Sequence, residues 1–154
     1  MPYMIDGHNL IPKLGLRLED PDDEMELVRL LQDFARIRRQ QVEVYFDGAP
    51  AGQAGTRKLG SIKAHFVRQG QTADNAIRKR LETLGKAAKN WVIVSSDHEV
   101  QSAAKVNQAQ FIRSEDFVKQ LRNALITITT EDHVDSKLSA KEVEEWMKIF
   151  SKGE

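Results

Sequence analysis

The sequence predicts an α/β fold with a mainly parallel central sheet and helices on both of its faces. Short runs of β-branched and aromatic residues alternate with amphipathic helical patterns along the chain. The run WVIV at residues 91–94 is apolar without alternation, which is typical of a parallel strand buried on both sides. A chain of 154 residues, 40% of them hydrophobic, suits one globular domain over residues 1–154.

The predicted elements follow one another without a linker or an internal repeat. The predicted strands are residues 3–5, 42–46, 61–67, 91–94 and 109–112, and the predicted helices are residues 21–40, 73–89, 97–106, 115–125 and 139–151. In the first helix, Asp20 suits the N-cap and Pro21 the first helical position. The glycine- and alanine-rich residues 48–60 are predicted to form a mobile loop.

Capping residues define the later helices. Thr72 can cap the helix over 73–89. Ser96 and Glu99 form a capping box that places Asp97 in the first helical turn after the buried strand. Ser114 can cap the next helix, whose continuation through residues 126–129 is ambiguous. Ser139 and Glu142 form a second capping box, so a C-terminal helix over 139–151 is expected to pack on the domain.

Composition excludes several classes of protein. The chain has no cysteine, which rules out disulfides and thiolate metal sites and favours a reducing, cytoplasmic location. Neither a secretory signal nor an apolar run long enough to cross a membrane is recognisable. The 23 basic and 23 acidic residues balance overall. Residues 57–89 nevertheless hold nine basic and two acidic residues, an excess of seven positive charges. Such asymmetry indicates a cationic face for a polyanion, although a solvated helix face would also account for residues 78–80.

Acidic residues follow three of the predicted strands. Asp6, Asp47 and Asp97 come at strand ends, and Asp74 falls in the first turn of a helix that starts at the same edge. Right-handed β/α crossovers bring these positions together. Neighbouring carboxylates repel one another unless a cation compensates, and all-oxygen ligation suits Mg²⁺ or Mn²⁺. For any one of these residues, a favourable interaction with a helix dipole is the simpler alternative.

Four short motifs follow one another along the chain: IDGHNLI at residues 5–11, VYFDG at 44–48, GQTAD at 70–74 and VSSD at 94–97. Together they resemble the YacP-like branch of the NYN-domain family, whose members are PIN-like ribonucleases. Their order and spacing match from residue 3 to about residue 125. His8 stands where an aromatic residue such as tyrosine is expected, and Gln71 stands where a glutamate often precedes T-A-D. The resemblance implies a PIN-like three-layer α/β/α sandwich.

The resemblance also implies a ribonuclease that depends on Mg²⁺ or Mn²⁺ and acts in RNA processing or decay. Cleavage within the RNA chain is the expected mode, and exonucleolytic cleavage is the open alternative. Asp6, Asp74 and Asp97 fall on the family's acidic metal-binding positions, Asp47 on a further strand-end acid, and Asn9 on a polar position of the first motif. We expect all four aspartates to be catalytic metal ligands. The expected substrate-binding or orienting residues are Asn9, Arg57, Lys58, Thr72, Arg78, Arg80, Ser95 and Ser96.

Two other functions are compatible with the sequence. A catalytically inactive PIN-like module would bind RNA or a protein through the same surface. A receiver-type phosphoacceptor domain also carries aspartates at strand ends, but it needs paired acids after the first strand, where only Asp6 stands. The RNA target, the oligomeric state and any association with the ribosome or an RNA-processing complex stay open.

Overall fold

The computed structural model describes residues 1–15, 21–50 and 52–135, and it contains one six-stranded sheet. The strand order is β3-β4-β2-β1-β5-β6. All neighbouring pairs are parallel except β3 and β4. The strands are β1 (Tyr3–Asp6), β2 (Val42–Ala49), β3 (Gly55–Leu59), β4 (Ile62–Arg68), β5 (Val92–Val94) and β6 (Gln110–Ile112).

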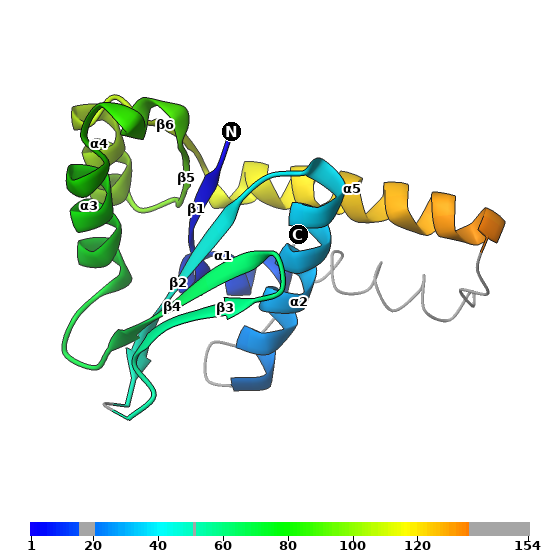
Figure 1. Cartoon of the computed structure of the whole chain (residues 1–154), viewed down its shortest axis with the longest axis horizontal. Helices are drawn as coiled ribbons and strands as arrows, with labels where there is room; N and C mark the ends of the chain where they lie inside the picture. Colours follow the sequence, from blue (N-terminus) through cyan, green and yellow to red (C-terminus); the bar gives the residue numbers. More distant parts are fainter. Residues whose placement is uncertain (16–20, 51, 136–154) are drawn as a thin grey trace.

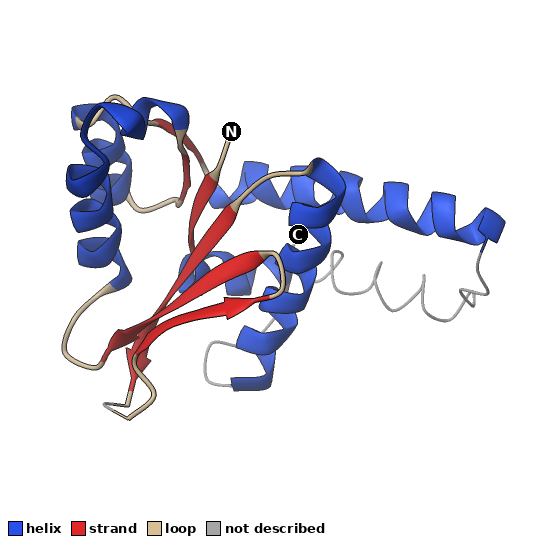
Figure 2. Cartoon of the chain, viewed as in Figure 1, coloured by secondary structure: helices blue, strands red, loops and turns tan. Residues whose placement is uncertain are grey.

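Helices cover the two faces of the sheet, as predicted (Figures 1 and 2). On one side lie α2 (Pro21–Arg38) and α5 (Ser114–Asp135), together with the short α1 (Gly7–Leu10) and the 3₁₀ helix η1 (Ile11–Leu14). On the other side lie α3 (Ala73–Leu84), the 3₁₀ helix η2 (Gly85–Asn90) and α4 (His98–Val106). The predicted three-layer α/β/α fold with a mainly parallel sheet is therefore confirmed.

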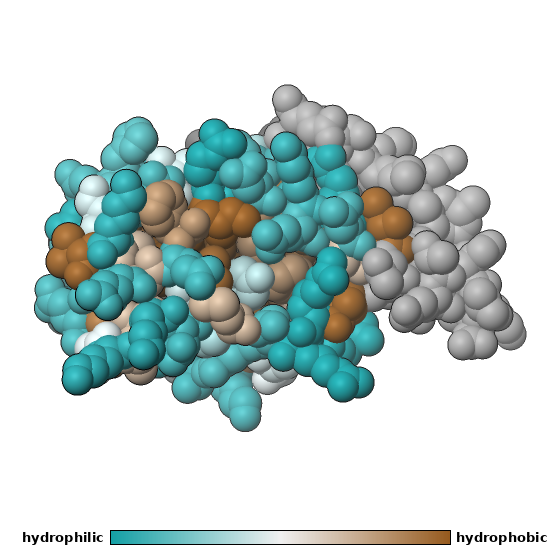
Figure 3. All heavy atoms as spheres, turned by 90° about the horizontal axis from the view of Figure 1, so that it is seen from above, coloured by the Kyte–Doolittle hydropathy of each residue, from teal (hydrophilic) through white to brown (hydrophobic). Residues whose placement is uncertain are grey.

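Each face of the sheet packs its own hydrophobic core, because side chains alternate between the faces along a strand. Ile5, Val44 and Phe46 face α2 and α5, where Phe34 and Phe117 are fully buried. The opposite core holds a second set of residues, which includes Met4, Tyr45, Ile77, Leu81, Trp91, Ile93 and Val100. Figure 3 shows one outer face of the molecule, on which hydrophobic areas are small and separated by hydrophilic residues.

The segment predicted as a loop over residues 48–60 contains a strand, and this prediction is corrected. Strand β3 pairs antiparallel with β4, and the register joins Leu59 to Ile62 across a two-residue turn. The turn residues are Gly60, whose φ is +64°, and Ser61. Gly-Ser between two strands is a hairpin signal. The polar residues Thr56, Arg57 and Lys58 concealed the strand, because four of its five residues are exposed and show no apolar pattern.

Helix boundaries also differ from the predictions. Helix α3 ends at Leu84 because Gly85 takes a positive φ of +56°, and a 3₁₀ helix follows it. Asp97 is the N-cap of α4 and lies just before the first turn, where Ser96 was expected to be the cap. Helix α5 continues through the ambiguous residues 126–129 to Asp135. The predicted helix over 139–151 and the Asp20 cap lie outside the described residues. In the described part of the chain, every helix is too short or too polar to span a membrane.

Glu43 is a buried acid in the middle of β2, with a relative exposure of 1%. Its carboxylate accepts hydrogen bonds from Arg80 at 3.1 Å and from the Tyr45 hydroxyl at 3.1 Å, and it lies 3.2 Å from Nε2 of His65. Burial alone raises the pKa of Glu43, but the hydrogen bonds from His65 and Arg80 outweigh it and lower the pKa to about 2. Glu43 therefore stays ionised and ties β2 to β4 and α3.

Replacing Glu43 by glutamine should lower the free energy of unfolding at pH 7 by about 2–3 kcal/mol, because a hydrogen bond to a charged group contributes about 1.5–3 kcal/mol. The folded-state pKa of Glu43 lies below the ordinary 4.5. Its contribution is therefore complete above that pH and is lost as the pH falls towards 2. Urea unfolding of both proteins at pH 7 and pH 3 measures the difference, which should shrink at pH 3. Equal stabilities at pH 7 would contradict this account of the network.

Candidate active site

Three neighbouring strands end at one edge of the sheet, and the predicted site residues follow them. Strand β1 lies between β2 and β5. Asp6 is the last residue of β1, Asp47 lies near the end of β2, and residues 95–97 follow β5. Helix α3 starts at the same edge, because the backbone N–H of Ala73 donates a short hydrogen bond to Oδ1 of Asp47. The edge therefore joins residues that are far apart in the sequence.

Gly7 sets how closely the ends of β1 and β2 approach each other. A Cβ atom at Gly7 would lie 2.6 Å from Cε1 of Phe46 and 2.9 Å from the carbonyl oxygen of Tyr45. Real Cβ atoms essentially never come that close to another heavy atom. The chain can therefore turn from Asp6 into α1 against β2 only with glycine at this position.

Asp6 is a buried acid with a relative exposure of 9%, and among the described residues it forms no ion pair, although His8 is near enough to lower its pKa slightly. Its Oδ2 atom accepts a hydrogen bond of 3.4 Å from the Ser95 hydroxyl. Burial raises the pKa of Asp6 to about 6, and the negative charge of Asp47 adds to the effect. In contrast to Glu43, Asp6 holds its charge at neutral pH at a cost to folding.

Asp47 and His8 are joined through the backbone. The N–H of Asp47 lies 3.3 Å from Nδ1 of His8, so this nitrogen accepts and Nε2 carries the proton of the neutral ring. Nε2 lies 2.8 Å from Oε2 of Glu24 in α2. The Asp47 carboxylate lies at the first turn of α3, where backbone N–H groups and the helix dipole favour negative charge. Glu24 was absent from the residues predicted from the sequence, because no local motif contains it.

Ser95 connects Asp6 with the loop that carries Asp97. Its hydroxyl donates to Asp6 and accepts from the backbone N–H of Asp97 at 3.0 Å. The Asp97 carboxylate is exposed and accepts the N–H of Glu99 at 2.8 Å, as an N-cap does. Asp97 thus lies at the rim of the site, and its backbone is oriented by the serine that also contacts Asp6.

Asp74 pairs with a cation of its own helix. Arg78 donates two hydrogen bonds to the Asp74 carboxylate, at 3.1 and 2.8 Å, and a third to Glu99 of α4 at 2.7 Å. The side chain of Thr72 accepts the N–H of Asn75 at 3.1 Å, which confirms the predicted cap of α3. The ion pairs therefore occupy both Asp74 and Arg78 in this structure.

Asn9 connects the ends of β5 and β6. Its side-chain oxygen accepts the backbone N–H of Ser96 at 2.9 Å and the hydroxyl of Ser114 at 2.6 Å. The Ser96 hydroxyl in turn donates to Glu115 at 2.9 Å, and Lys13 lies 2.9 Å from the same carboxylate. Lys13 is the first cause of the low pKa of Glu115, about 2. Asn9 and Ser96 hence hold the edge together, whichever further contacts they make.

The acids fit a divalent cation only in part. Among the side chains that the structure describes, no three from His, Asp or Glu are grouped closely enough to hold a metal ion. Asp47 is close enough to Asp6 for its negative charge to raise the pKa of Asp6. Asp74 and Asp97 instead bond to the separate partners described above. Magnesium is commonly held by one or two carboxylates, with waters and substrate phosphates as the other ligands. Asp6 and Asp47 suit that smaller set.

The predicted phosphate-binding residues do not share one surface. Arg80 is paired with the buried Glu43 and lies 5.4 Å above the ring of Trp91. Arg57 and Lys58 are consecutive in β3, so their side chains leave opposite faces of the sheet. Both are exposed, and Arg57 lies 4.8 Å above the ring of Phe66.

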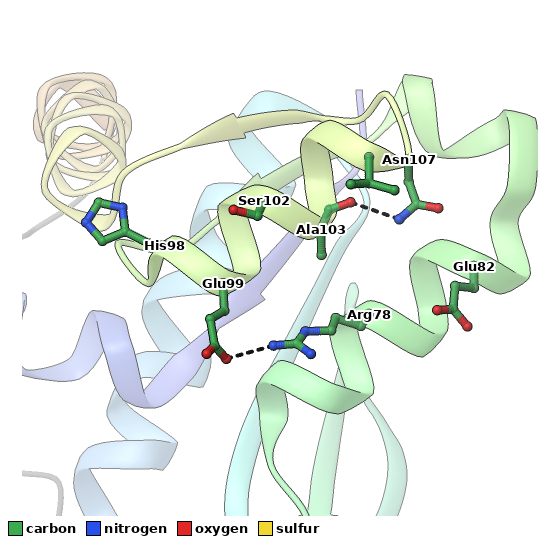
Figure 4. A pocket seen from close by; sticks show the side chains of 8 residues that line it. Arg78, Glu82, His98, Glu99, Ser102, Ala103 and Asn107 are labelled. Atoms are coloured by element: carbon green, nitrogen blue, oxygen red, sulfur yellow. Dashed lines mark hydrogen bonds and ion pairs between the residues drawn. The ribbon is translucent and has the colours of Figure 1, made fainter.

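An open groove of about 510 Å³ runs between the second half of α3 and the length of α4 (Figure 4). Arg78 reaches across it from α3 to Glu99 of α4. The groove is lined by Arg78, Glu82, His98, Glu99, Ser102, Ala103, Val106 and Asn107. Two glutamates against one paired arginine make it a poor site for an anion.

Comparisons with known proteins agree with this fold. Two crystal structures of Rae1 (YacP) from Bacillus subtilis are similar to the chain. The W164L mutant has a TM-score of 0.71 at 21% identity, over 97% of this chain and 92% of that one. The other has a TM-score of 0.66 at 20% identity, over 99% and 93%. No curated protein sequence matches.

The family assignment follows from the sequence profile. The sequence model of the YacP-like NYN domain family matches residues 3–151, nearly the whole chain. This match includes the strand ends that carry Asp6, Asp47 and Asp97, and it confirms the resemblance seen in the four motifs. The chain belongs to the YacP-like NYN domain family, a family of nuclease-type domains.

Proposed function

We propose that this protein is a metal-dependent ribonuclease that hydrolyses phosphodiester bonds within RNA chains, in RNA processing or decay in the cytoplasm. The observation that carries the proposal is the pair of Asp6 and Asp47. Asp6 is buried beside a second carboxylate, forms no ion pair among the described residues, and has a pKa raised to about 6 in spite of the nearby His8. Folding alone gives no reason to keep two carboxylates in this arrangement, whereas a divalent cation compensates them.

Each acid has a role in the proposed site. Asp6 and Asp47 would hold Mg²⁺ or Mn²⁺ directly, and Asp74 and Asp97 at the rim would act on the same region through water or through the substrate. The bound ion would supply the charge that polarises the phosphodiester and eases deprotonation of the attacking water. Ser95 would orient Asp6 and the Asp97 loop together, since its hydroxyl contacts both.

The remaining predicted residues have supporting roles in this proposal. Thr72 caps α3 and keeps its first turn beside Asp47, and Asn9 and Ser96 hold the ends of β5 and β6. Lys58 is an exposed candidate for phosphate contact. Contact of Arg57, Arg78 and Arg80 with RNA stays a prediction, as do the ribosome or an RNA-processing complex as partners. An inactive RNA-binding module is the alternative, and it predicts binding without cleavage.

Asp6→Asn should stabilise the metal-free protein at pH 8. The pKa of Asp6 is about 6 in the folded state against 3.8 ordinarily. The parent's free energy of unfolding should therefore fall as the pH rises from about 4 through 6, because Asp6 ionises more easily in the unfolded chain. We expect the variant's free energy of unfolding to exceed the parent's by about 1–3 kcal/mol at pH 8 in EDTA, and by little at pH 4.

The matched control for this stability measurement is Asp97→Asn, which makes the same chemical change at the same sheet edge. Asp97 is exposed, and asparagine is as good an N-cap as aspartate. Urea unfolding should show little difference from the parent at either pH. A destabilised Asp6→Asn at pH 8 would mean that the Asp6 carboxylate is favourably paired.

Cleavage of RNA is the direct test of the proposed function. The parent should cut single-stranded RNA with Mg²⁺ or Mn²⁺ and stop in EDTA. The cleavage rate of Asp6→Asn should be more than about 100-fold below that of the parent, a larger loss than the 10–100-fold typical of residues that only orient a ligand. Asp33→Asn, in α2 away from the site, should keep the parent's rate. Since Asp6→Asn is expected to be at least as stable as the parent, unfolding would not explain its loss. Cleavage by Asp6→Asn at the parent's rate would refute the proposed site.

A further inference from the structure

Strands β4 and β3, at one end of the sheet, have a face that is partly open beyond the cover that α3 gives to β2. Along β4, Ile62 and Ala64 are buried against α2, whereas Lys63 is exposed and His65 half-exposed. On β3, Thr56 and Lys58 are exposed and lie on the same face as His65 and Lys63, because paired residues share a side of the sheet. We call Thr56, Lys58, Lys63 and His65 the open face.

The open face lies on the same side of the sheet as the Asp6 side chain, and β2, whose Tyr45 and Glu43 are buried, lies between them. One row of paired residues runs from Asp6 through Tyr45 and His65 to Thr56. The neighbouring row runs from Met4 through Glu43 and Lys63 to Lys58. With strands about 4.8 Å apart and two residues along a strand spanning about 6.7 Å, the backbones of Lys63 and Lys58 lie roughly 12 and 16 Å from that of Asp6, on the side of the sheet where Asp6 points.

Positive charge on the open face is not compensated. Lys58 and Lys63 lie directly opposite each other in the antiparallel pair, an arrangement that destabilises a sheet when the charges are alike. Neither lysine forms an ion pair within the described residues. Glu43, the acid in their row, is buried and bonded to Arg80 and His65. A polyanion bound to this face would relieve the repulsion.

The residues between the lysines and Asp6 are held in place. The His65 ring stacks on Tyr45 with centroids 4.4 Å apart, and its two nitrogens lie 2.8 Å from the Thr56 hydroxyl and 3.2 Å from Glu43. This network fixes the β3–β4 hairpin relative to β2 and α3. The open face is therefore a rigid surface, which lowers the entropic cost of binding.

We propose that the RNA strand leaves the reacting centre across the open face, with two of its phosphates bound by Lys58 and Lys63. The inference rests on the proposed function for the identity of the polyanion. Of the two hairpin residues predicted to contact phosphates, Arg57 and Lys58, this inference keeps only Lys58. It adds Lys63, which lies on the same face of the sheet. The groove between α3 and α4 is a weaker path, because Glu82 and Glu99 line it.

The test is binding of a fluorescent single-stranded RNA in EDTA, followed by anisotropy over a range of salt concentrations. Each phosphate contact on single-stranded nucleic acid contributes about 0.7 to the slope of log K against log salt. Lys58→Gln/Lys63→Gln should therefore flatten the slope by about 1.4 and weaken binding on the order of tenfold or more at 0.1 M salt. Its melting temperature should equal or slightly exceed that of the parent, because a like-charge pair is removed.

The matched control is Lys86→Gln/Lys89→Gln, which removes the same charge from the same basic segment. Both residues are exposed in η2, which leads into the opposite end of β5. This control should keep most of the parent's slope. Equal losses in the two double variants would overturn the inference, because only net charge would then matter. Arg57→Gln tests the other face of β3, and a larger loss there than in Lys58→Gln would also overturn it.

The outcomes separate this inference from the proposed function, since binding in EDTA involves no cleavage. An unchanged salt slope in Lys58→Gln/Lys63→Gln would overturn the open face as an RNA path, whatever Asp6→Asn does. Full cleavage by Asp6→Asn would instead refute the reacting centre and leave the binding result intact. Loss of binding to anionic phospholipid vesicles, with RNA binding unchanged, would assign the face to a membrane surface and overturn the inference.

Discussion

The close approach of β1 and β2 at their carboxyl ends is the constraint on which the site depends. Gly7 permits it, since any side chain there would meet Phe46 and the backbone of Tyr45. The approach brings Asp6 next to Asp47 and lets the Asp47 carboxylate accept the first N–H of α3. One side of the site is thereby fixed by backbone geometry, which a change of side-chain rotamer does not disturb.

Two buried acids on the same face of the sheet show opposite electrostatic solutions. Glu43 receives hydrogen bonds from His65, Arg80 and Tyr45, and its pKa falls to about 2. Asp6 receives hydrogen bonds from the Asn9 backbone and the Ser95 hydroxyl, but its burial and the charge of Asp47 outweigh them, and its pKa rises to about 6. The first arrangement stabilises the fold, and the second is retained against stability. This contrast separates a structural carboxylate from a candidate functional one more sharply than position at a strand end does.

Local patterns in the sequence predicted the alternation of strands and helices, because apolar runs and caps such as Thr72 act over a few residues. They failed at β3, whose exposed polar residues have no apolar pattern. They also could not identify partners distant in the chain. Asn9 and Ser114 bond across 105 positions, and Arg80 reaches Glu43 across 37. Arg80, predicted as a phosphate ligand from its basic segment, therefore proves to be the partner of a buried acid. The sequence motifs identified the sheet edge at which the candidate site lies. The contacts in the folded structure then distinguished structural residues such as Arg80 from candidate functional ones.

The central claim is that Asp6 and Asp47 form a carboxylate pair that a divalent cation compensates. Carbon-detected NMR titration of the Asp6 side chain, with and without millimolar Mg²⁺, measures this directly and requires no RNA. The account predicts a pKa near 6 in the metal-free protein and a clear downward shift when Mg²⁺ is present, because the bound cation favours the ionised form. An ordinary pKa that Mg²⁺ leaves unchanged would contradict it.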